Sequence, residues 1–438
     1  MGLAHMAEMR DDLMGFCTRL KQEFGDIVHF RLGALPCFQL THPEHLHEVL
    51  VQKAASFRKQ RRLKQVFGRF EGNGLVVSDG PLWERQRRIV QPAFAPSRLP
   101  EYAALMRPCV EEMLADWNQI DRVDIVTQMR HLMLRIIART LFSADVDDVI
   151  APLAEAVSEI QQWSMQQMHR VIATPNWLPL WGASKARRAI KLLHREVQRI
   201  IRLRQSRKTS ENDLLGQLIA ATDVKGQGQR MSNRQLHDEL VTMLLAGHET
   251  SAAAVTWSVW LLAKHPEIQQ QVATEVERAL HGRAPTFADI PQLAGVEQVF
   301  KEAMRLFPPV YFLSREAVDK VEVGGYVFPP NSQVFLVPYL SHRDSRWFAE
   351  PERFDPLRFT HDSEAQLPPC CYFPFGAGPR ACVGRGFAML EGTLVLAAIL
   401  QMFELQTPLG ASEPVPAWQL SLHPQGKLEI AICSRSAT

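Results

Sequence analysis

The sequence predicts a mainly α-helical protein with a small β-rich lobe, in which all 438 residues form one domain. Long segments carry apolar residues at three- and four-residue spacings, as amphipathic helices do. Short β-branched runs bounded by glycine and proline gather near the start of the chain and again after Phe307, as strands and turns do. No internal repeat or low-complexity linker divides the chain, so a single domain is expected.

Periodicity and turn residues then assign each element in chain order. Residues 26–31 have the pattern of a strand, and residues 42–52 that of a helix. Helices are next expected at residues 110–140, 149–172, 186–204, 213–221 and 232–265. Ser232 is a suitable N-cap for the last of these, and Pro266 is expected to close it.

The remaining elements alternate between sheet and helix. They are strands at 321–327 and 333–337, a helix at 386–402, and a pair of strands within 418–432. The β-rich lobe is therefore expected to comprise residues 20–56, 307–340 and 415–433, and the helical body the rest of the chain.

Composition excludes several functional classes. The 49 Lys and Arg residues nearly balance the 47 Asp and Glu residues, so no attraction to nucleic acid is expected. Seven scattered cysteines, none in a C-x-x-C pair, indicate neither a disulfide framework nor a structural zinc, and they favour a reducing, cytoplasmic location. Charges interrupt the first residues, and no uncharged apolar run reaches the roughly 18 residues that span a bilayer, so no transmembrane anchor is expected.

The segment FPFGAGPRACVGRG, residues 373–386, is the most informative in the chain. Four glycines and two prolines surround the single cysteine Cys382, directly before an apolar helix. Glycine lets the backbone approach a bulky planar group closely, and a helix N-terminus stabilises a thiolate. The alternative is an inert buried cysteine in a glycine-rich turn.

This loop resembles the haem-binding signature of the cytochrome P450 superfamily at Phe375, Gly378, Arg380, Cys382 and Gly384. The resemblance, which is to soluble bacterial-type members, implies the cytochrome P450 fold with haem b (iron protoporphyrin IX) as cofactor. It implies that Cys382 ligates the haem iron, and that the haem lies between the helix at 232–265 and the helix after the cysteine loop. Thiolate donation favours O–O cleavage in this family.

The segment AGHETS, residues 246–251, interrupts the helix expected at 232–265. Ala246 and Gly247 would create a notch, and Thr250 and Glu249 could relay protons into it. The segment resembles the oxygen-activating motif of the same superfamily, which implies that Ala246 and Gly247 face the haem and that Thr250 and Glu249 are catalytic. His248 is expected to be structural.

Two further groups of residues match the superfamily. Glu302 and Arg305, one helical turn apart, resemble its Glu-x-x-Arg helix, and Arg353 resembles the partner arginine of a buried structural network. The resemblance also implies that four residues hold the haem propionates, with charge-assisted hydrogen bonds from the arginines: Trp83, Arg87, Arg315 and Arg380.

Positions that commonly contact substrate in this superfamily are strongly apolar here and favour a hydrophobic substrate such as a fatty acid, terpene or steroid. They are Phe67, Phe70, Leu75, Val76, Trp163, Met165, Met168, Met243, Ala246, Val310, Phe312 and Leu420. Each one individually is also an ordinary core residue type.

No flavin or iron–sulfur module follows the matched region, so electrons are expected from a separate ferredoxin or flavodoxin and its reductase. Such an acidic partner would dock on basic residues at 58–64 and on Arg85, Arg88 and Arg385. The alternative for the 58–64 run is an ordinary solvated helix face.

The expected function is that of a haem-thiolate monooxygenase, which uses O₂ and two electrons to hydroxylate or epoxidise a hydrophobic small molecule. A peroxide-driven peroxygenase or a haem-thiolate isomerase is the alternative with the same fold. A non-catalytic haem-binding sensor is a further alternative.

Overall fold

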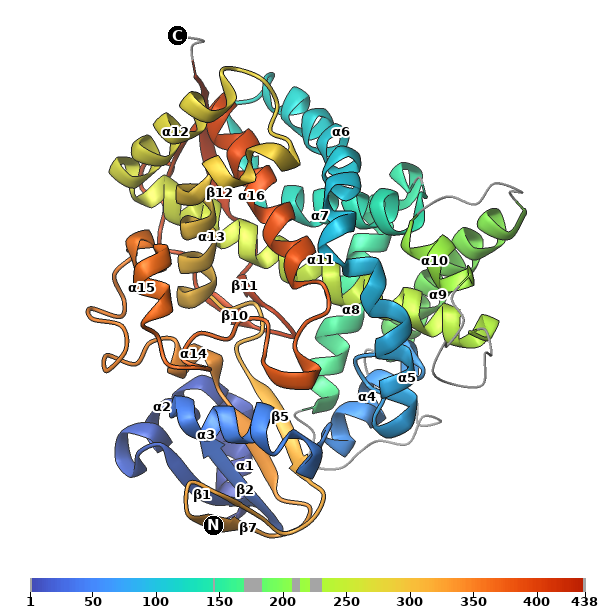
Figure 1. Cartoon of the computed structure of the whole chain (residues 1–438), viewed down its shortest axis with the longest axis vertical. Coiled ribbons are helices and arrows are strands. Elements are labelled where there is room, and N and C mark those ends of the chain that lie inside the picture. The colour runs from blue at the N-terminus through green and yellow to red at the C-terminus, as the bar shows by residue number, and fades with distance from the viewer. Residues whose placement is uncertain (1, 145, 169–182, 207–212, 221–230, 436–438) are drawn as a thin grey trace.

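The computed structural model describes residues 2–144, 146–168, 183–206, 213–220 and 231–435, and it sets a helical body against a smaller β-rich lobe (Figure 1). The helices are α1 (Gly2–Asp11), α2 (Leu13–Phe24), α3 (Pro43–His47), α4 (Arg61–Glu71), α5 (Gly80–Val90), α6 (Leu99–Trp117), α7 (Ile125–Phe142), α8 (Ile150–Met168), α9 (Ala183–Ser206), α10 (Leu214–Ala220), α11 (Asn233–Lys264), α12 (Pro266–Leu280), α13 (Ala294–Leu306), α14 (Pro338–Ser341), α15 (His361–Ala365) and α16 (Arg385–Met402). The strands are β1 (Ile27–Leu32), β2 (Leu35–Leu40), β3 (Phe57–Arg58), β4 (Arg122–Asp124), β5 (Leu313–Ala317), β6 (Val321–Val323), β7 (Tyr326–Phe328), β8 (Gln333–Leu336), β9 (Phe403–Gln406), β10 (Pro416–Trp418), β11 (Leu422–Pro424) and β12 (Glu429–Ser434).

The lobe is built on a five-stranded sheet with the strand order β1-β2-β8-β5-β3. Its central pair, β2 and β8, is parallel, with Phe38 opposite Val334, and the other pairs are antiparallel. Strand β1 alternates buried and exposed residues because helix α2 covers one of its faces. Phe16 of α2 packs there against Phe30 of β1, with ring centroids 5.3 Å apart.

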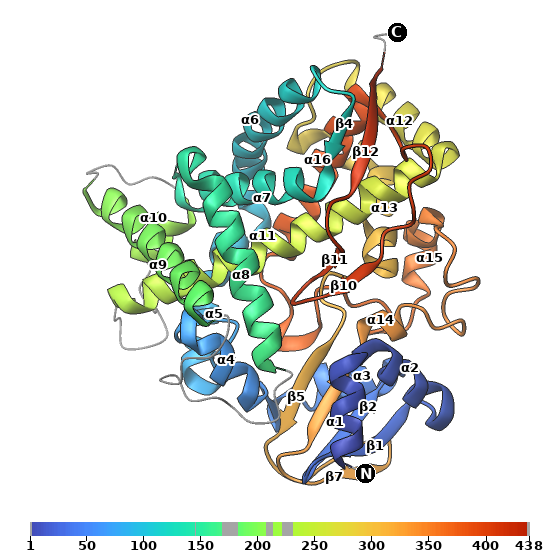
Figure 2. The same ribbon diagram turned by 180° about the vertical axis from the view of Figure 1, so that it is seen from behind.

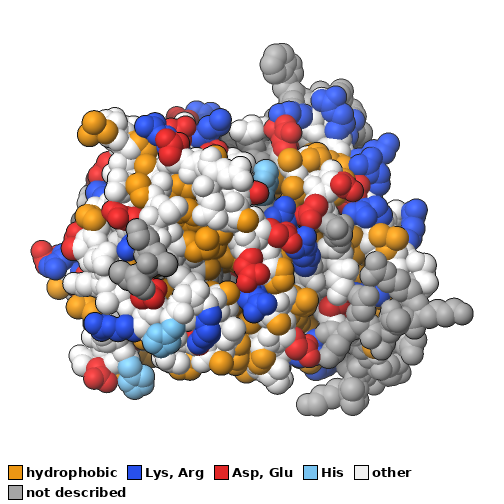
Figure 3. Space-filling model, turned by 90° about the horizontal axis from the view of Figure 1, so that it is seen from above, with side chains coloured by type: hydrophobic (Ala, Val, Ile, Leu, Met, Phe, Trp, Pro, Cys, Tyr) orange, Lys and Arg blue, Asp and Glu red, His pale blue; other side chains and the backbone are white. Residues whose placement is uncertain are grey.

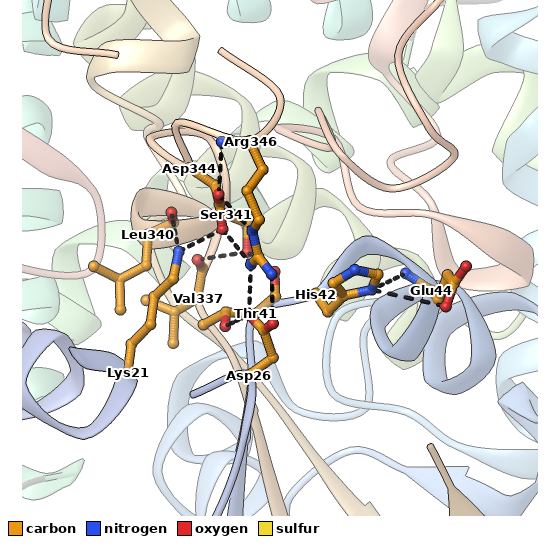
Figure 4. A network of polar contacts seen from close by, with 10 residues as sticks. All are labelled: Lys21, Asp26, Thr41, His42, Glu44, Val337, Leu340, Ser341, Asp344 and Arg346. Carbon is orange, nitrogen blue, oxygen red and sulfur yellow. Dashed lines mark hydrogen bonds and ion pairs between the residues drawn. The ribbon is translucent and has the colours of Figure 1, made fainter. Parts of the chain in front are cut away.

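A network of charged side chains ties the lobe to the segment after α14 (Figure 4). Asp344 accepts hydrogen bonds from Lys21 Nζ at 2.8 Å and from Arg346 Nη2 at 2.6 Å. Arg346 also bonds both carboxylate oxygens of Asp26 at 2.7 Å, and Asp26 in turn accepts from the hydroxyl of Thr41. These hydrogen bonds hold the pKa of Asp344 well below its ordinary range, against the opposing effect of burial.

Replacing Asp344 by asparagine is expected to lower the free energy of unfolding by about 1–3 kcal/mol at neutral pH, because a buried acceptor of charged hydrogen bonds is lost. A carboxyl group with a depressed folded-state pKa stabilises the fold above its unfolded pKa, about 3.9, and loses that contribution as the pH falls through its folded-state value. The unfolding free energies of the wild type and Asp344→Asn, measured by urea titration, should therefore differ most at neutral pH and become similar in acid. Glu350→Gln, which breaks an exposed pair with Arg353, is the control and should change little.

Helix α11 crosses the centre of the helical body in both views (Figures 1 and 2). As expected, Ser232 caps its N-terminus: the Ser232 hydroxyl accepts from the Gln235 N–H, and the Gln235 side chain accepts from the Ser232 N–H. The helix ends at Lys264, and Pro266 then opens α12, because proline is tolerated at the first helical position. Helices α7, α13 and α16 pack around α11.

Helix α16 follows the cysteine loop and is mostly apolar, although it begins at Arg385 and carries the buried Glu391. Among the described residues it is the one helix long and apolar enough to cross a membrane, yet 67% of it is buried within the protein. It packs against α6, α11, α12 and α13, which makes it a core helix of the body.

Some expected elements differ in the structure. The single helix expected at 110–140 is wrong: strand β4 separates α6 from α7, because polar residues at 116, 118, 119, 121 and 122 break the apolar pattern. The strand pair expected within 418–432 is also wrong, since β11 pairs with β10, whereas β12 pairs with β4 and β9. The 415–433 segment therefore lies outside the five-stranded sheet. The ends of the helices expected at 149–172 and 213–221 lie outside the described residues.

Candidate functional site

The loop before α16 is held in a shape that glycine alone permits. Gly378 has φ +67°, and a Cβ atom added there would lie 2.0 Å from the backbone oxygen of Leu50. Leu50 belongs to a π-helical turn, residues Glu48–Gln52, against which the loop packs. The backbone N–H of Cys382 donates to the Phe375 carbonyl at 2.8 Å and closes the loop. Backbone packing therefore accounts for Gly378 in this loop.

The Cys382 side chain keeps accessible surface, although it lies deep among protein atoms. Burial raises the pKa of its thiol, whereas a hydrogen bond from the Gly384 N–H and the positive charge of Arg87 act in the opposite direction. Within the described residues, no group of three or more His, Cys, Asp or Glu side chains is placed to hold a metal ion.

Helix α11 has one open face in the middle of an otherwise buried stretch. Ala246 is exposed and Thr250 is half-buried, whereas His248 and Glu249 are buried. The Thr250 hydroxyl donates to the Ala246 carbonyl at 2.7 Å, one turn back along the helix. The notch expected at Gly247 is in part a packing feature, because a Cβ atom there would lie 2.9 Å from Ile137 Cδ1 of α7.

Glu249 does not share that open face, because consecutive helical residues point about 100° apart. Its carboxylate is buried, with Oε2 at 2.6 Å from Nε2 of His423 and Oε1 at 3.4 Å from Nε of Arg130. The sequence did not predict the contact between Glu249 and His423, because no sequence pattern relates strand β11 to the middle of α11.

Three of the residues expected to hold the propionates lie beside the cysteine loop. Arg87 Nη1 donates to the carbonyl of Ala381, the residue before Cys382, at 2.7 Å. The Arg380 guanidinium lies over the Trp83 ring, with its central carbon 4.2 Å from the ring centroid.

Arg315 and Arg380 belong to a cluster of cations that also contains Lys59; Arg315 is buried, and Arg380 and Lys59 are half-buried. Burial and the charges of Arg315 and Arg380 lower the pKa of Lys59 to about 7, and burial and Arg380 lower the pKa of Arg315 to about 10. Asp79 forms an ion pair with Arg380, and Asp79 and Glu71 are the acids that act on Lys59. Buried cations in excess of their acids are costly unless an anion joins them.

Lys59 was missed because it falls in the basic run at 58–64, which suggested a docking surface. Strand pairing explains its position: Arg58 lies opposite Glu316, and the next residue along therefore lies opposite Arg315. Arg58 and Arg61 of the same run pair with Glu316, but the Arg61 side chain is 63% exposed and that of Arg58 31%, so Arg61 fits the solvated face that was the alternative.

The residues around Cys382 fit a haem. A single accessible thiol supplies one metal ligand, the open face of α11 bears a hydroxyl, and the cation cluster suits the two carboxylates of a porphyrin. Cys382, Arg87, Arg315, Arg380 and Lys59 are the side chains that would hold it.

The expected structural network is present with one correction. The guanidinium of Arg305 bonds both carboxylate oxygens of Glu302, at 2.6 and 2.8 Å, and both side chains are fully buried. Arg353 is the wrong third member, because its side chain is 64% exposed and pairs with Glu350. The arginine that faces Glu302 is Arg358, whose Nε lies 3.5 Å from the carboxylate. Only the backbone carbonyl of Arg353 takes part, as an acceptor for Arg305.

The residues expected to line the substrate pocket fall into a buried group and a half-buried group. Phe67 and Phe70 pack against each other in α4 with tilted rings and, like Leu75 and Met243, are buried in the core. The half-buried members are Val76, Trp163, Met165, Met168, Val310, Phe312 and Leu420. The Leu422 N–H donates to the Pro309 carbonyl at 3.0 Å, which brings the turn of Leu420 close to Val310. That these residues line the substrate stays a prediction.

A groove of about 980 Å³ lies elsewhere, between α6, α12 and the C-terminal half of α16. It is at the opposite end of α16 from the Cys382 loop, on the upper part of the body in Figure 1. Seen from above, this end mixes apolar, basic and acidic side chains without a field of one sign (Figure 3). The groove therefore does not belong to the cysteine site.

Comparison with known proteins agrees with this geometry. The sequence profile of the family "Cytochrome P450" matches residues 1–431. Cyclooctatin synthase of Streptomyces melanosporofaciens is 37% identical, over 92% of this chain and 86% of its own. Pentalenene oxygenase of Streptomyces avermitilis is 30% identical, over 99% of this chain and 96% of its own. The crystal structure of the cytochrome P450DA heme domain superposes with a TM-score of 0.89 at 25% identity, covering 99% of this chain and 96% of that one.

These matches confirm the expected fold class and the resemblance stated above. The family implies a haem cofactor, molecular oxygen and a hydrophobic substrate. The chain belongs to the cytochrome P450 family and is a haem-dependent monooxygenase of that family.

Proposed function

We propose that this monooxygenase hydroxylates or epoxidises a cyclic terpene, with haem b held by Cys382 and two electrons taken from a separate protein. The observation that carries the substrate class is the pair of terpene-oxidising bacterial relatives, cyclooctatin synthase and pentalenene oxygenase. The apolar side chains of Val76, Val310 and Leu420 suit such a substrate, because they offer shape without charge.

When bound, the haem supplies the iron at which O₂ is activated, and the chain provides the ligand and the protons. Cys382 donates electron density as a thiolate. Thr250 presents a hydroxyl on the open face of α11, and Glu249 is the nearby acid that supplies protons to it. The cations Arg87, Arg315 and Arg380 would bind the propionates and fix the orientation of the ring.

The test uses the haem-loaded protein with a ferredoxin, its reductase and NADPH. Cyclic terpene hydrocarbons, fatty acids and steroids are compared by binding spectra and by product analysis under ¹⁸O₂. One ¹⁸O atom in a terpene product supports the proposal. Products from fatty acids or steroids alone would overturn the substrate class. Label incorporated only from H₂¹⁸O₂, with none from ¹⁸O₂, would instead identify a peroxygenase.

The electron donor is proposed to be a ferredoxin or flavodoxin that docks on the side of Cys382. Arg385 is exposed, follows Cys382 by three residues and lies over the Phe375 ring, which supports this face. Arg88 is exposed on α5. Arg85 is a weaker candidate, because its Nη1 donates to the Gln235 side chain of α11 at 3.4 Å. A cytoplasmic location without a membrane anchor completes the proposal.

Replacing Thr250 by alanine is expected to leave haem binding unchanged and to lower the product formed per electron pair by about tenfold, because general acid–base groups contribute at least that much. Hydrogen peroxide should rise in proportion. NADPH consumption, product and peroxide are measured together. Thr274→Ala is the matched control, since Thr274 makes the same bond to the carbonyl four residues back on an exposed helix face. Unchanged coupling in Thr250→Ala would contradict a role for the hydroxyl.

A further inference from the structure

Helix α9 carries basic side chains along one face. They occur at three- and four-residue spacings and form what we call the basic stripe: Arg188, Lys191, Arg195, Arg199 and Arg202. Residues at these spacings lie on one side of a helix, and the span from position 188 to position 202 is about 21 Å of helix. Arg199 is half-buried and the other four are exposed. The basic stripe is therefore a line of long, charged side chains on the protein surface.

The opposite face of α9 fixes the helix in the protein. Ala189, Leu193, Val197 and Ile200 lie on that face and are buried in the main hydrophobic core. Helices α8 and α11 pack against α9. In both ribbon views α9 lies at the outer edge of the helical body (Figures 1 and 2). Because its apolar face is already covered, α9 offers a partner only its charged face.

The charge of the basic stripe exceeds that of the acids on the same helix. Helix α9 contains eight Lys and Arg residues and one acid, Glu196, whereas the two kinds of charge are nearly equal over the whole chain. Glu196 pairs with Arg195 and Arg199, at 2.9 and 2.8 Å. Within the described part of the chain, neither Arg188 nor Lys191 has an acidic partner. The stripe therefore keeps a net positive charge.

The side chains of the basic stripe favour an anionic lipid surface over a folded protein as the partner. A stable protein interface has an apolar centre with aromatic or aliphatic anchors, and the stripe has no apolar member. An anionic bilayer attracts charge alone, and four to eight Lys and Arg residues on an amphipathic helix are typical of proteins that bind one. Since the apolar face of α9 is not available for insertion, such a contact is electrostatic.

The place of α9 in the fold agrees with a lipid partner. Trp163, Met165 and Met168, which are expected to line the substrate, belong to α8, and α8 packs along α9. A cyclic terpene hydrocarbon is apolar and therefore partitions from water into lipid. A protein held on a bilayer through α9 would meet this substrate at a high local concentration.

We propose that the basic stripe of α9 docks the protein reversibly on an anionic phospholipid bilayer, from which the protein takes its hydrophobic substrate. The inference rests on the proposed function, because an apolar substrate is what gives docking a purpose. The contact inserts no side chain into the lipid. Salt should weaken it, because salt screens the attraction between exposed charges.

The first test measures binding without turnover. The haem-loaded protein is sedimented with vesicles of phosphatidylcholine alone or with about 30% phosphatidylglycerol, in about 0.05 M and about 0.5 M NaCl. At low salt the wild type should partition at least about tenfold more strongly onto the anionic vesicles, and high salt should remove this preference. Equal binding to both kinds of vesicle, or binding that salt does not change, would overturn the proposal.

A triple variant tests whether the basic stripe is the surface that binds. Arg188→Gln, Lys191→Gln and Arg202→Gln are combined in one protein, because glutamine retains the helix propensity of these positions. Each cation near an anionic surface strengthens binding about fivefold, so partitioning onto the anionic vesicles should fall about 100-fold. Wild-type partitioning by this variant would show that another surface binds the lipid.

The matched control removes the same number of charges elsewhere. It combines Arg122→Gln, Arg278→Gln and Lys427→Gln, three exposed cations outside α9. Partitioning of the control should stay within about twofold of the wild type, because distant charges are screened by salt. A loss as large as that of the stripe variant would mean that net charge, and not α9, determines binding. Tighter binding to duplex DNA than to anionic vesicles, at equal phosphate concentration, would overturn the choice of a lipid partner.

Turnover separates failure of this proposal from failure of the proposed function. With a terpene presented in the anionic vesicles, the stripe variant should have a KM about tenfold above that of the wild type and the same kcat, since binding and not chemistry is changed. With the terpene dissolved in a cosolvent, the two proteins should have the same KM. If the wild type oxygenates no terpene, the proposed function fails, and sedimentation still decides whether the stripe binds lipid.

Discussion

Replacing Cys382 by serine is expected to abolish oxygenation and the red-shifted Soret band that a thiolate ligand gives the ferrous carbon monoxide complex. Serine has nearly the same shape and can accept the same hydrogen bond from the Gly384 N–H. Its hydroxyl, however, ionises far less readily than a thiol and donates less electron density to iron. The fold should survive, because the loop is held by backbone contacts such as that between Cys382 N–H and the Phe375 carbonyl.

The measurement is the difference spectrum, with haem content determined separately. Cys433→Ser is the control, since Cys433 is also accessible but lies on β12, and it should retain the full band. A red-shifted band of wild-type intensity in Cys382→Ser would show that another residue ligates the iron.

Replacing Arg305 by methionine is expected to lower the free energy of unfolding by about 3–5 kcal/mol, because Glu302 is left as an uncompensated buried charge. The guanidinium also donates to the backbone carbonyls of His342 and Pro351, at 2.9 and 2.7 Å, so these acceptors lose a partner as well. The network joins α13 to the segment that leads to the cysteine loop. Haem retention should therefore fall together with stability.

Burial raises the pKa of Glu302 even with Arg305 beside it. A carboxyl group whose pKa is raised in the folded state lowers the stability of the protein as the pH rises above the unfolded pKa, about 4.3. Removing Arg305, which lowers the pKa of Glu302, raises that pKa further. The difference in unfolding free energy between the wild type and Arg305→Met should therefore be larger at pH 8 than at pH 5. Urea unfolding at both pH values tests this.

Two matched variants test whether Arg358, and not Arg353, is the third side chain of the Glu302–Arg305 network. Arg358→Met should cost about 1–3 kcal/mol, since one charged partner of Glu302 is removed and Arg305 remains. Arg353→Met should cost less than about 1 kcal/mol, because that side chain is an exposed ion-pair partner. A larger loss of unfolding free energy in Arg353→Met than in Arg358→Met would show that Arg353 is the network residue.

The sequence predicted well those features that local chemistry determines. The N-cap at Ser232, the apolar helix α16 and the glycine at position 378 each follow from residues adjacent in the chain. The pair of Glu302 and Arg305 could also be predicted, because the two residues lie one turn apart on a single helix.

Features set by the packing of distant segments could not be predicted in this way. Arg353 matched a local pattern, but the arginine that turns inward, Arg358, belongs to the 3₁₀ turn Pro356–Phe359. Lys59 reaches the cation cluster only through the pairing of β3 with β5, and His423 reaches Glu249 only through the docking of β11 on α11. Such contacts depend on tertiary register, which no periodicity in a single sequence specifies.

The parallel pairing of β2 with β8 has a consequence for biosynthesis. Residues 35–40 leave the ribosome roughly 300 residues before their partners at 333–336, which at about 5–20 residues per second is a delay of roughly 15–60 s. During that time one edge of the β1–β2 hairpin has no neighbour and is a template for aggregation. Yield in the cell should therefore depend on chaperone supply during translation, and the β1–β2 hairpin should stay sensitive to proteolysis until residues 333–336 have left the ribosome.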